Sequence, residues 1–374
     1  MQNTDSYAVV PVILCIWPRR DFVMATESYH KQMNKKNELK LRELRAELPS
    51  FCDRYFRGIE PTTASRTRIA YAIDLKVFFE YVQTQIPRFA SRNVFTSDIS
   101  LLDEITCYDI ENYLDYLKVY TNSEGVTYTN DENGLKRKLS AVRSLYRYFY
   151  FRHEVSGNPA SQVAVPKIHE KAIVRLDENE TAELLDTVEY GMGGSDHMQV
   201  FHEKNKVRDL ALVTLLLGTG IRISECIGLD LMDVDFDNDR IKVTRKGGNE
   251  AYVYFGSEVR EALMEYFQKR CSLTAASGSE NALFLSNRMT RISVRNAEVL
   301  VKKYAKAAVS LKKITPHKLR STYGTQLYKE TGDIYLVADV LGHKDVNTTR
   351  RHYAAIEEER RRSAKDKVHL RKEE

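Results

Sequence analysis

Three stripes of apolar residues, recurring at intervals of three and four, run through residues 63–150 and indicate helices throughout that region. The stripes are Ile69, Ala72, Leu75, Phe79 and Val82, then Ile105, Ile110, Leu114 and Leu117, and then Leu135, Leu139, Val142, Tyr146 and Phe149. The second stripe predicts a helix over residues 103–120, and the polar, turn-rich residues 122–134 predict a loop. The first half of the chain is therefore expected to form an all-α domain.

A chain of 374 residues is long enough for two domains with separate cores. Ser-Gly-Asn-Pro at residues 156–159 ends the helical region, and residues 163–175, with Pro166 and mixed charge, have the composition of a linker. Leu176 then precedes a run of acidic residues suited to the first turn of a helix. We expect a flexible or helical lead-in over residues 1–44, a helical domain over 45–165, a linker over 166–173, and a second domain with a C-terminal tail over 174–374.

The second half of the sequence has a mixed pattern. Residues 210–217 and 223–229 read as helices, and Gly218-Thr219-Gly220 interrupts them. Residues 241–244 and 251–254 read as two strands with a Gly-Gly pair between them, which favours a hairpin, and the chain after Glu258 is helical in pattern. The polar residues 191–206 are expected to form a surface loop. The second domain is therefore predicted to be mixed α+β.

Composition excludes some classes of protein. The net charge is only +5, so any nucleic-acid surface must come from local clustering of charge. The five cysteines include no Cys-x-x-Cys pair, which argues against a disulfide framework or a zinc site and fits a reducing cytoplasm. The apolar residues 9–17 are too short to span a bilayer and lack the basic flank of a signal peptide; translation beginning at Met24 is an alternative.

Five residues of the second half could together attack a phosphodiester: Arg222, His317, Arg320, His343 and Tyr353. A tyrosine oxygen can form a covalent bond to phosphorus and later leave. Two arginines can donate paired hydrogen bonds to the non-bridging oxygens, and a histidine or lysine can protonate the departing oxygen. Each residue alone has an ordinary explanation, since the chain has 22 tyrosines and most tyrosines pack in cores. Their order and their flanking sequences favour a catalytic set.

The flanking sequences resemble those of the tyrosine recombinases, a family that includes phage-type integrases and chromosome-dimer resolvases. They are Thr-Gly-Ile-Arg-Ile-Ser-Glu at 219–225, Thr-Pro-His-Lys-Leu-Arg at 315–320, Leu-Gly-His at 341–343 and Arg-Arg-His-Tyr at 350–353. The resemblance implies that Tyr353 is the nucleophile and that Glu225 orients a neighbour. It also implies a catalytic set of Arg222, Lys246, His317, Arg320, His343 and Tyr353, with Lys246 as the general acid.

The chain departs from the commonest family pattern at some positions, one of which is Ser321, in place of a frequent histidine after Arg320. The hairpin reads Arg-Lys-Gly-Gly-Asn-Glu in place of Gly-Lys-Gly followed by further basic residues, so Arg245 and Lys242 are rivals of Lys246 as the general acid. Tyr353 lies ten residues after His343, whereas many members of the family have nine; both spacings occur.

A basic stripe accompanies the third apolar stripe, with Lys136, Ser140, Arg143 and Arg147 at spacings of four, three and four. A helix with one apolar face and an adjoining basic face can pack inward and present cations to phosphates. The alternative is a basic face that only contacts solvent. Because the resembling family has an all-helical DNA-binding domain at this place, we expect these four residues to contact DNA.

The resemblance implies a site-specific recombinase that cuts and rejoins DNA through a 3′-phosphotyrosyl intermediate, without cofactor or metal. The biological role would be integration or excision of a mobile element, or chromosome-dimer resolution. The expected partners are double-stranded DNA with paired sites and a homotetramer on synapsed DNA, with the C-terminal tail as a route to assembly. No membrane is involved, and the expected location is the cytoplasmic nucleoid. The alternatives are a type IB topoisomerase and a catalytically silent DNA-binding regulator.

Overall fold

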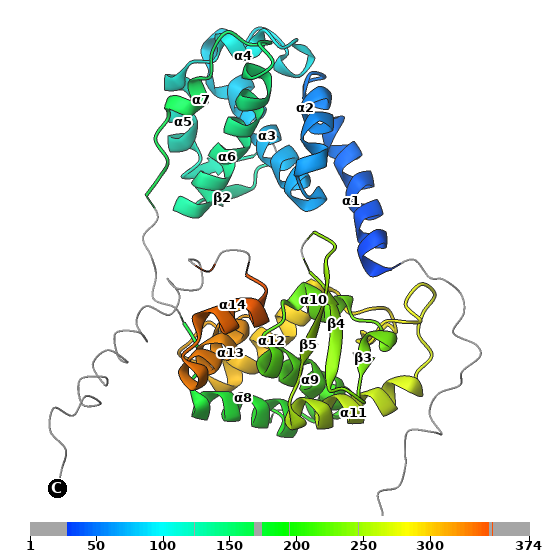
Figure 1. Ribbon diagram of the computed structural model, residues 1–374. Coiled ribbons are helices and arrows are strands. Elements are labelled where there is room, and N and C mark those ends of the chain that lie inside the picture. Colours follow the sequence, from blue (N-terminus) through cyan, green and yellow to red (C-terminus); the bar gives the residue numbers. More distant parts are fainter. Residues whose placement is uncertain are drawn as a thin grey trace, which may run out of the picture.

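The computed structural model describes residues 28–122, 124–167, 174–193, 195–245, 247–343 and 346. Figure 1 shows two helix-rich bodies, which we call the first and second lobes. Buried apolar side chains form one core within residues 41–163, a second within 176–319 and a small third around Tyr328, Val337 and Leu341. The expected two-part fold, helical first and mixed second, is confirmed.

The first lobe packs its helices around two long ones, α3 and α6. Its helices are α1 (Tyr29–Arg45), α2 (Cys52–Ile59), α3 (Ser65–Gln85), α4 (Leu101–Glu104), α5 (Cys107–Tyr116), α6 (Glu132–Tyr150) and α7 (Pro159–Gln162). Leu75 and Phe79 of α3 and Val142 of α6 have no exposed surface, so these members of the predicted apolar stripes lie in the core.

Helix α1 belongs to the first lobe, although its residues were expected to form a separate lead-in. It packs against α3, with Leu41 and Leu44 buried, and Glu38 accepts a hydrogen bond of 2.7 Å from Arg68. The core of this lobe therefore begins before residue 45. At the other end of α1, the ring of Tyr29 lies 4.8 Å from the guanidinium of Arg291 in the second lobe.

A short hairpin replaces part of the loop expected at residues 122–134. Strands β1 (Val119–Thr121) and β2 (Thr127–Thr129) pair antiparallel, and Tyr120 stacks on Tyr128 with ring centroids 5.4 Å apart. Gly125 has a φ of +77° in the turn between them. The helix expected over residues 103–120 ends at Tyr116, because the Val, Tyr and Thr residues that follow favour extended backbone.

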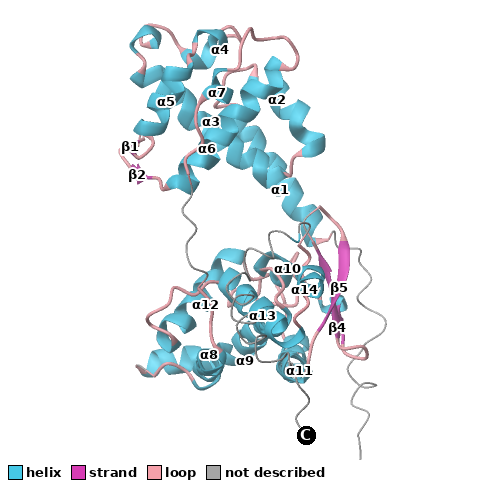
Figure 2. Ribbon diagram, turned by 60° about the vertical axis from the view of Figure 1, so that its left-hand side comes forward, coloured by secondary structure: helices cyan, strands magenta, loops and turns pink. Residues whose placement is uncertain are grey.

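The second lobe combines helices with a small antiparallel sheet of order β3-β4-β5 (Figure 2). Its strands are β3 (Val234–Asp235), β4 (Arg240–Thr244) and β5 (Glu250–Tyr254). Its helices are α8 (Glu178–Tyr190), α9 (Asp196–Thr219), α10 (Ile223–Gly228), α11 (Ser257–Cys271), α12 (Val294–Ala308), α13 (Pro316–Thr331) and α14 (Ile334–Leu341). The predicted β4–β5 hairpin is confirmed, with Ile241 opposite Val253.

Helix α9 overturns the prediction of a surface loop at residues 191–206. It begins at Asp196 and runs for 24 residues to Thr219. His202 is only 7% exposed, its Nε2 lies 2.9 Å from the carbonyl oxygen of Val188, and its ring contacts Tyr304. In the part of the chain that the structure describes, neither α9 nor any other helix is long and apolar enough to span a membrane.

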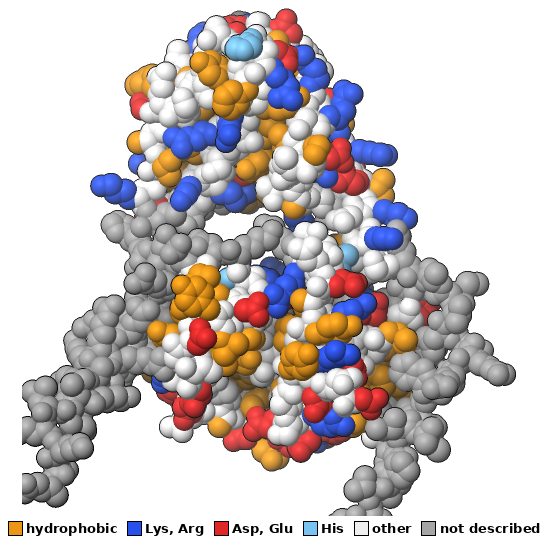
Figure 3. All heavy atoms as spheres, viewed as in Figure 1, with side chains coloured by type: hydrophobic (Ala, Val, Ile, Leu, Met, Phe, Trp, Pro, Cys, Tyr) orange, Lys and Arg blue, Asp and Glu red, His pale blue; other side chains and the backbone are white. Residues whose placement is uncertain are grey.

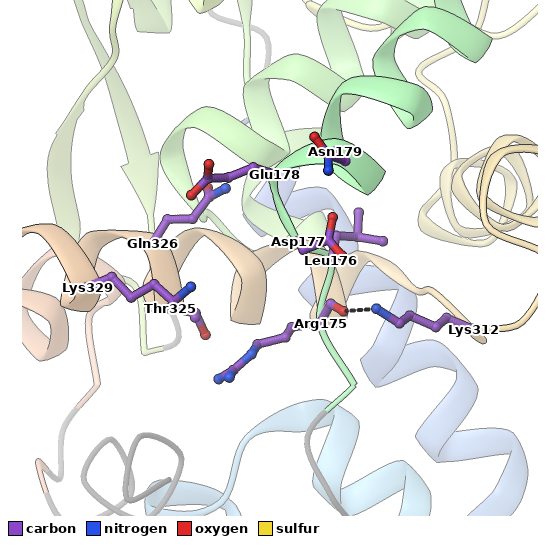
Figure 4. A pocket seen from close by; sticks show the side chains of 9 residues that line it. All are labelled: Arg175, Leu176, Asp177, Glu178, Asn179, Lys312, Thr325, Gln326 and Lys329. Carbon is purple, nitrogen blue, oxygen red and sulfur yellow. Dashed lines mark hydrogen bonds between the residues drawn. The ribbon is translucent and has the colours of Figure 1, made fainter. Parts of the chain in front are cut away.

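The start of the second lobe is tied to α13, which carries two of the predicted catalytic residues. The backbone N–H of Leu176 donates to the Thr322 hydroxyl at 3.0 Å, and Lys312 Nζ donates to the Arg175 carbonyl at 3.1 Å and to Glu180 at 2.6 Å. These contacts border a cavity of about 390 Å³ (Figure 4). Lys312 is neutralised by Glu180 here, so we read this region as an anchor for the chain entering the lobe.

Candidate active site

The break between α9 and α10 places Arg222 against the last two described helices. Gly220 ends α9 in the left-handed region, with φ of +62°. A Cβ at Gly220 would overlap the ring of Tyr323 on α13 and the side chain of Leu341 on α14. Only glycine therefore allows these two helices to pack so closely against the break between α9 and α10. Arg222 is then the N-cap residue of α10.

Glu225 accepts two hydrogen bonds from Arg222. The Arg222 backbone N–H donates to Glu225 at 2.9 Å, and its guanidinium Nη1 donates to the other carboxylate oxygen at 2.7 Å. The Glu225 side chain is 5% exposed, whereas that of Arg222 is 36% exposed. The pair therefore fixes the direction of a guanidinium that solvent, or a phosphate, can still reach. This supports the orienting role expected of Glu225.

Arg320 lies deeper in the same place. It is on α13, three residues after His317, and is 4% exposed. Its Nη1 donates to the Gly220 carbonyl at 2.8 Å, and its Nη2 donates to the carbonyl of Leu341. His317 is itself exposed near the start of α13. Arg320 therefore joins the break between α9 and α10, where Arg222 lies, to the end of α14.

The C-terminal end of α14 is where these segments meet. Gly342 caps the helix in the left-handed region with φ of +64°, and the His343 backbone N–H donates to the Ala338 carbonyl at 2.9 Å. Arg222 Nη2 donates to the Gly342 carbonyl at 3.3 Å, one residue after the carbonyl that Arg320 contacts. The structure thus brings together Arg222, Arg320 and the backbone of His343, which are separated by up to 121 positions along the chain.

Tyr353 and Lys246 lie outside the described residues, so their predicted roles depend on the sequence. The two rivals of Lys246 are described, and both are engaged elsewhere. Lys242 Nζ lies 3.4 Å from Glu250 and 3.9 Å from Asp233. Arg245 donates to the carbonyls of Asp339 at 3.3 Å and Val340 at 3.1 Å, a contact that sequence reasoning did not find. Both rivals of Lys246 therefore have partners among the described residues.

A cysteine beside the site is a poor rival for the nucleophile. Cys226 follows Glu225 in α10 and is fully buried. Burial raises the pKa of its thiol far above the ordinary range, so the thiol stays protonated at neutral pH.

The four residues predicted to contact DNA do not have equivalent environments. Lys136, Ser140 and Arg147 are exposed on α6, and the Arg147 guanidinium lies 5.4 Å from the centre of the Phe151 ring. Arg143 instead donates to the carbonyl of Ala160 at 2.9 Å and to that of Val163. It fastens α7 and the residue that follows it to α6, which is a structural contact.

Charge is distributed unevenly over the molecule. Figure 3 shows many Lys and Arg side chains on the visible face of the first lobe, and Asp and Glu gathered at the end of the second lobe that points away from the first. Phosphates would be repelled from that acidic end and attracted toward the basic face of the first lobe.

Comparisons with known proteins show the family of the chain. Residues 174–360 match the phage integrase family. The chain is 31% identical to the tyrosine recombinase XerS of Streptococcus uberis over 365 residues, which cover 88% of this chain and 98% of that protein. It is 30% identical to the tyrosine recombinase XerC of Caldanaerobacter subterraneus, covering 85% of this chain and 86% of that protein.

Solved structures show the same fold. XerH bound to a palindromic difH substrate superposes with a TM-score of 0.57 at 18% identity, covering 80% of each chain. A lambda integrase tetramer bound to a Holliday junction gives 0.57 at 17% identity, covering 81% of this chain and 76% of that one. The chain belongs to the phage integrase family of tyrosine recombinases. Its enzymatic class is that of site-specific DNA recombinases, as the sequence predicted, and the named relatives do not favour a topoisomerase.

Proposed function

We propose that Arg222 and Arg320 bind the scissile phosphate and that Tyr353 attacks it. The observation that carries this proposal is the convergence of both guanidinium groups on the end of α14, directly before His343. Two fixed guanidinium groups can stabilise the negative charge that develops on the non-bridging oxygens. His317 and His343 assist from the start of α13 and the end of α14.

The reaction proceeds in two balanced transfers. The Tyr353 hydroxyl passes its proton to one of the site histidines, His317 or His343, as its oxygen forms a bond to phosphorus, and the bond from phosphorus to the 5′ oxygen breaks. Lys246 gives that oxygen its proton, leaving a 3′-phosphotyrosyl protein and a free 5′-hydroxyl. The 5′-hydroxyl of a partner strand then attacks the phosphotyrosyl bond and gives its proton to Lys246, while the released tyrosine oxygen takes back its proton from the histidine.

The biological role we propose is recombination at paired chromosomal sites, of the kind that resolves chromosome dimers. The relatives named XerC and XerS support this role over integration or excision of a mobile element. A catalytically silent regulator, the alternative from another class, is disfavoured because every predicted catalytic residue type is present in the sequence. The enzyme would act at the nucleoid.

The assembly we propose is a homotetramer on two synapsed duplexes. Lambda integrase forms a tetramer on a Holliday junction, and its fold is the same. The first lobe, near residues 45–165 with α1 added, would bind one side of the duplex, and the second lobe, from residue 174, would bind the other. Deleting residues 360–374 should impair synapsis more than single-site binding, and equal recombination by the shortened chain would count against a docking tail.

The test uses a nicked suicide duplex that carries inverted repeats from DNA flanking the gene. Wild type and Tyr353→Phe are compared for a protein–DNA adduct that resists SDS. We expect an adduct with wild type only, because phenylalanine has no oxygen to bond to phosphorus.

Each other outcome points to a different error. An adduct with Tyr353→Phe would mean that another residue is the nucleophile. Tight, site-specific binding without an adduct for wild type would support the silent regulator. Strand exchange between two separate duplexes distinguishes a recombinase from a topoisomerase, which only relaxes supercoils.

A further inference from the structure

Three arginines hold the end of α14, and the family resemblance accounts for only two of them. Four successive carbonyls each accept a guanidinium N–H: Asp339 and Val340 from Arg245, Leu341 from Arg320 and Gly342 from Arg222. The last carbonyls of a helix lack the donors of a continuing helix and carry partial negative charge, although the Asp339 carbonyl also accepts from the Gly342 N–H at 2.8 Å. A guanidinium group both donates hydrogen bonds to these carbonyls and neutralises their partial negative charge.

Arg245 is well placed to brace this turn because its own backbone is fixed. It stands directly after β4, its N–H donates to the Asn249 carbonyl at 2.7 Å, and its carbonyl accepts from the Gly248 N–H at 3.0 Å. The side chain therefore starts from a hydrogen-bonded backbone and crosses to a helix more than 90 residues away in sequence. The planar fork of arginine can meet two adjacent carbonyls, which a lysine ammonium cannot do in the same geometry.

Gly342 and Arg245 fit together closely. A Cβ on Gly342 would overlap the Arg245 guanidinium, and the φ of +64° at Gly342 already disfavours any other residue. The guanidinium thus packs directly on the residue whose carbonyl holds Arg222. A shift of the Arg245 side chain would therefore displace the carbonyls of Leu341 and Gly342, and with them His343.

We propose that Arg245 is a positioning residue for strand cleavage. It holds the C-terminal turn of α14 so that the Leu341 and Gly342 carbonyls keep Arg320 and Arg222 in register, with His343 directly after them. The proposal rests on the roles given above to those three residues. Arg245 acts through them and does not bind the phosphate itself.

The test measures cleavage and binding separately, on a nicked duplex that the wild-type chain cleaves. Arg245→Ala is compared with wild type and Arg245→Lys. A matched control is Arg240→Ala, which removes an arginine from the same strand; Arg240 contacts Asp235 at 2.8 Å and the Tyr252 ring. The readouts are the single-turnover rate at saturating DNA, the Kd, and the dependence of the Kd on salt.

The expected result is a loss of rate without a loss of binding. Misplaced catalytic groups should slow cleavage by Arg245→Ala about 10- to 100-fold. The Kd and its salt dependence should match wild type, because no phosphate contact is lost. Arg245→Lys should recover part of the rate, and Arg240→Ala should cleave like wild type.

Three results would overturn the proposal. One is an Arg245→Ala variant that cleaves within threefold of wild type. Another is a weaker Kd with a shallower salt dependence and a normal saturated rate, which would make Arg245 a phosphate ligand. The third is an equal loss of rate in Arg240→Ala, which would reflect general damage to the sheet. Tyr353→Phe is run beside them: if it forms an adduct, the proposed nucleophile fails, whatever Arg245 does.

Discussion

Arg143 in the first lobe and Arg320 in the second make the same kind of contact. Each gives its guanidinium to two main-chain carbonyls of other segments: Arg143 to Ala160 and Val163, and Arg320 to Gly220 and Leu341. Neither contact is special alone, because arginines often complete the hydrogen bonding of helix ends. The surroundings of the two arginines differ.

The segments around Arg320 bring further functional groups, and those around Arg143 do not. Arg222 contacts the carbonyl next to the one that Arg320 contacts, and His343 follows directly. Within the described residues, the side-chain hydrogen bonds of Arg143 reach α7 and the first residue beyond it. A site is therefore indicated by several charged side chains converging from separate segments, and a single arginine bound to carbonyls only shows that two segments are joined.

The largest effect in this comparison is expected for Arg320. Arg320→Ala should slow single-turnover cleavage by about 100- to 1,000-fold, the usual effect of removing one donor that stabilises transition-state charge. The substitution also leaves two carbonyls without a donor. The free energy of unfolding, measured in urea, should therefore fall by about 1–3 kcal/mol. Arg320→Lys keeps the charge but not the fork and should cleave almost as poorly. A saturated rate near wild type in either variant would remove Arg320 from the catalytic set.

A smaller effect, of a different kind, is expected for Arg143. Arg143→Ala should lower the free energy of unfolding by about 1–3 kcal/mol, because two carbonyls lose their donor. Its cleavage rate at saturating DNA, measured well below the unfolding transition, should stay close to that of wild type. The contrast with Arg320 breaks down if Arg143→Ala weakens DNA binding and makes its salt dependence shallower, since that would show a phosphate contact.

The sequence predicts that Arg222 and Arg320 act together, because their flanking sequences and order are typical of one chemistry. It could not predict which carbonyls hold them, since these come from residues up to 120 positions away. It also could not separate Arg143 from Arg147, which share one helix face at a spacing of four. Only the position of α7 distinguishes them, and that position is a tertiary property.

The two incorrect loop predictions have a common cause. Residues 196–206 are mostly polar, and their helix is stabilised by packing that includes the buried His202 against Tyr304. Residues 119–129 form a hairpin in which Tyr120 stacks on Tyr128. In both places tertiary contacts of polar or aromatic residues decide the backbone, and local propensity is a weak guide there.

The smallest effect is expected along the exposed part of α6, where Lys136 and Arg147 test whether the whole basic stripe contacts DNA. Helix α6 begins at the end of the first lobe near the second lobe and runs to the far end (Figure 1), and Lys136 is four residues after its first residue, Glu132. A rise of about 16 Å separates Lys136 from Arg147. Because DNA is proposed to lie between the lobes, Lys136→Ala should weaken binding severalfold and lower the slope of log affinity against log salt by about 0.9. Arg147→Ala, which removes the same charge from the same helix, should change both quantities less. Equal losses in the two variants would extend the DNA contact along the whole stripe, and no loss in either would leave α6 as a solvated face.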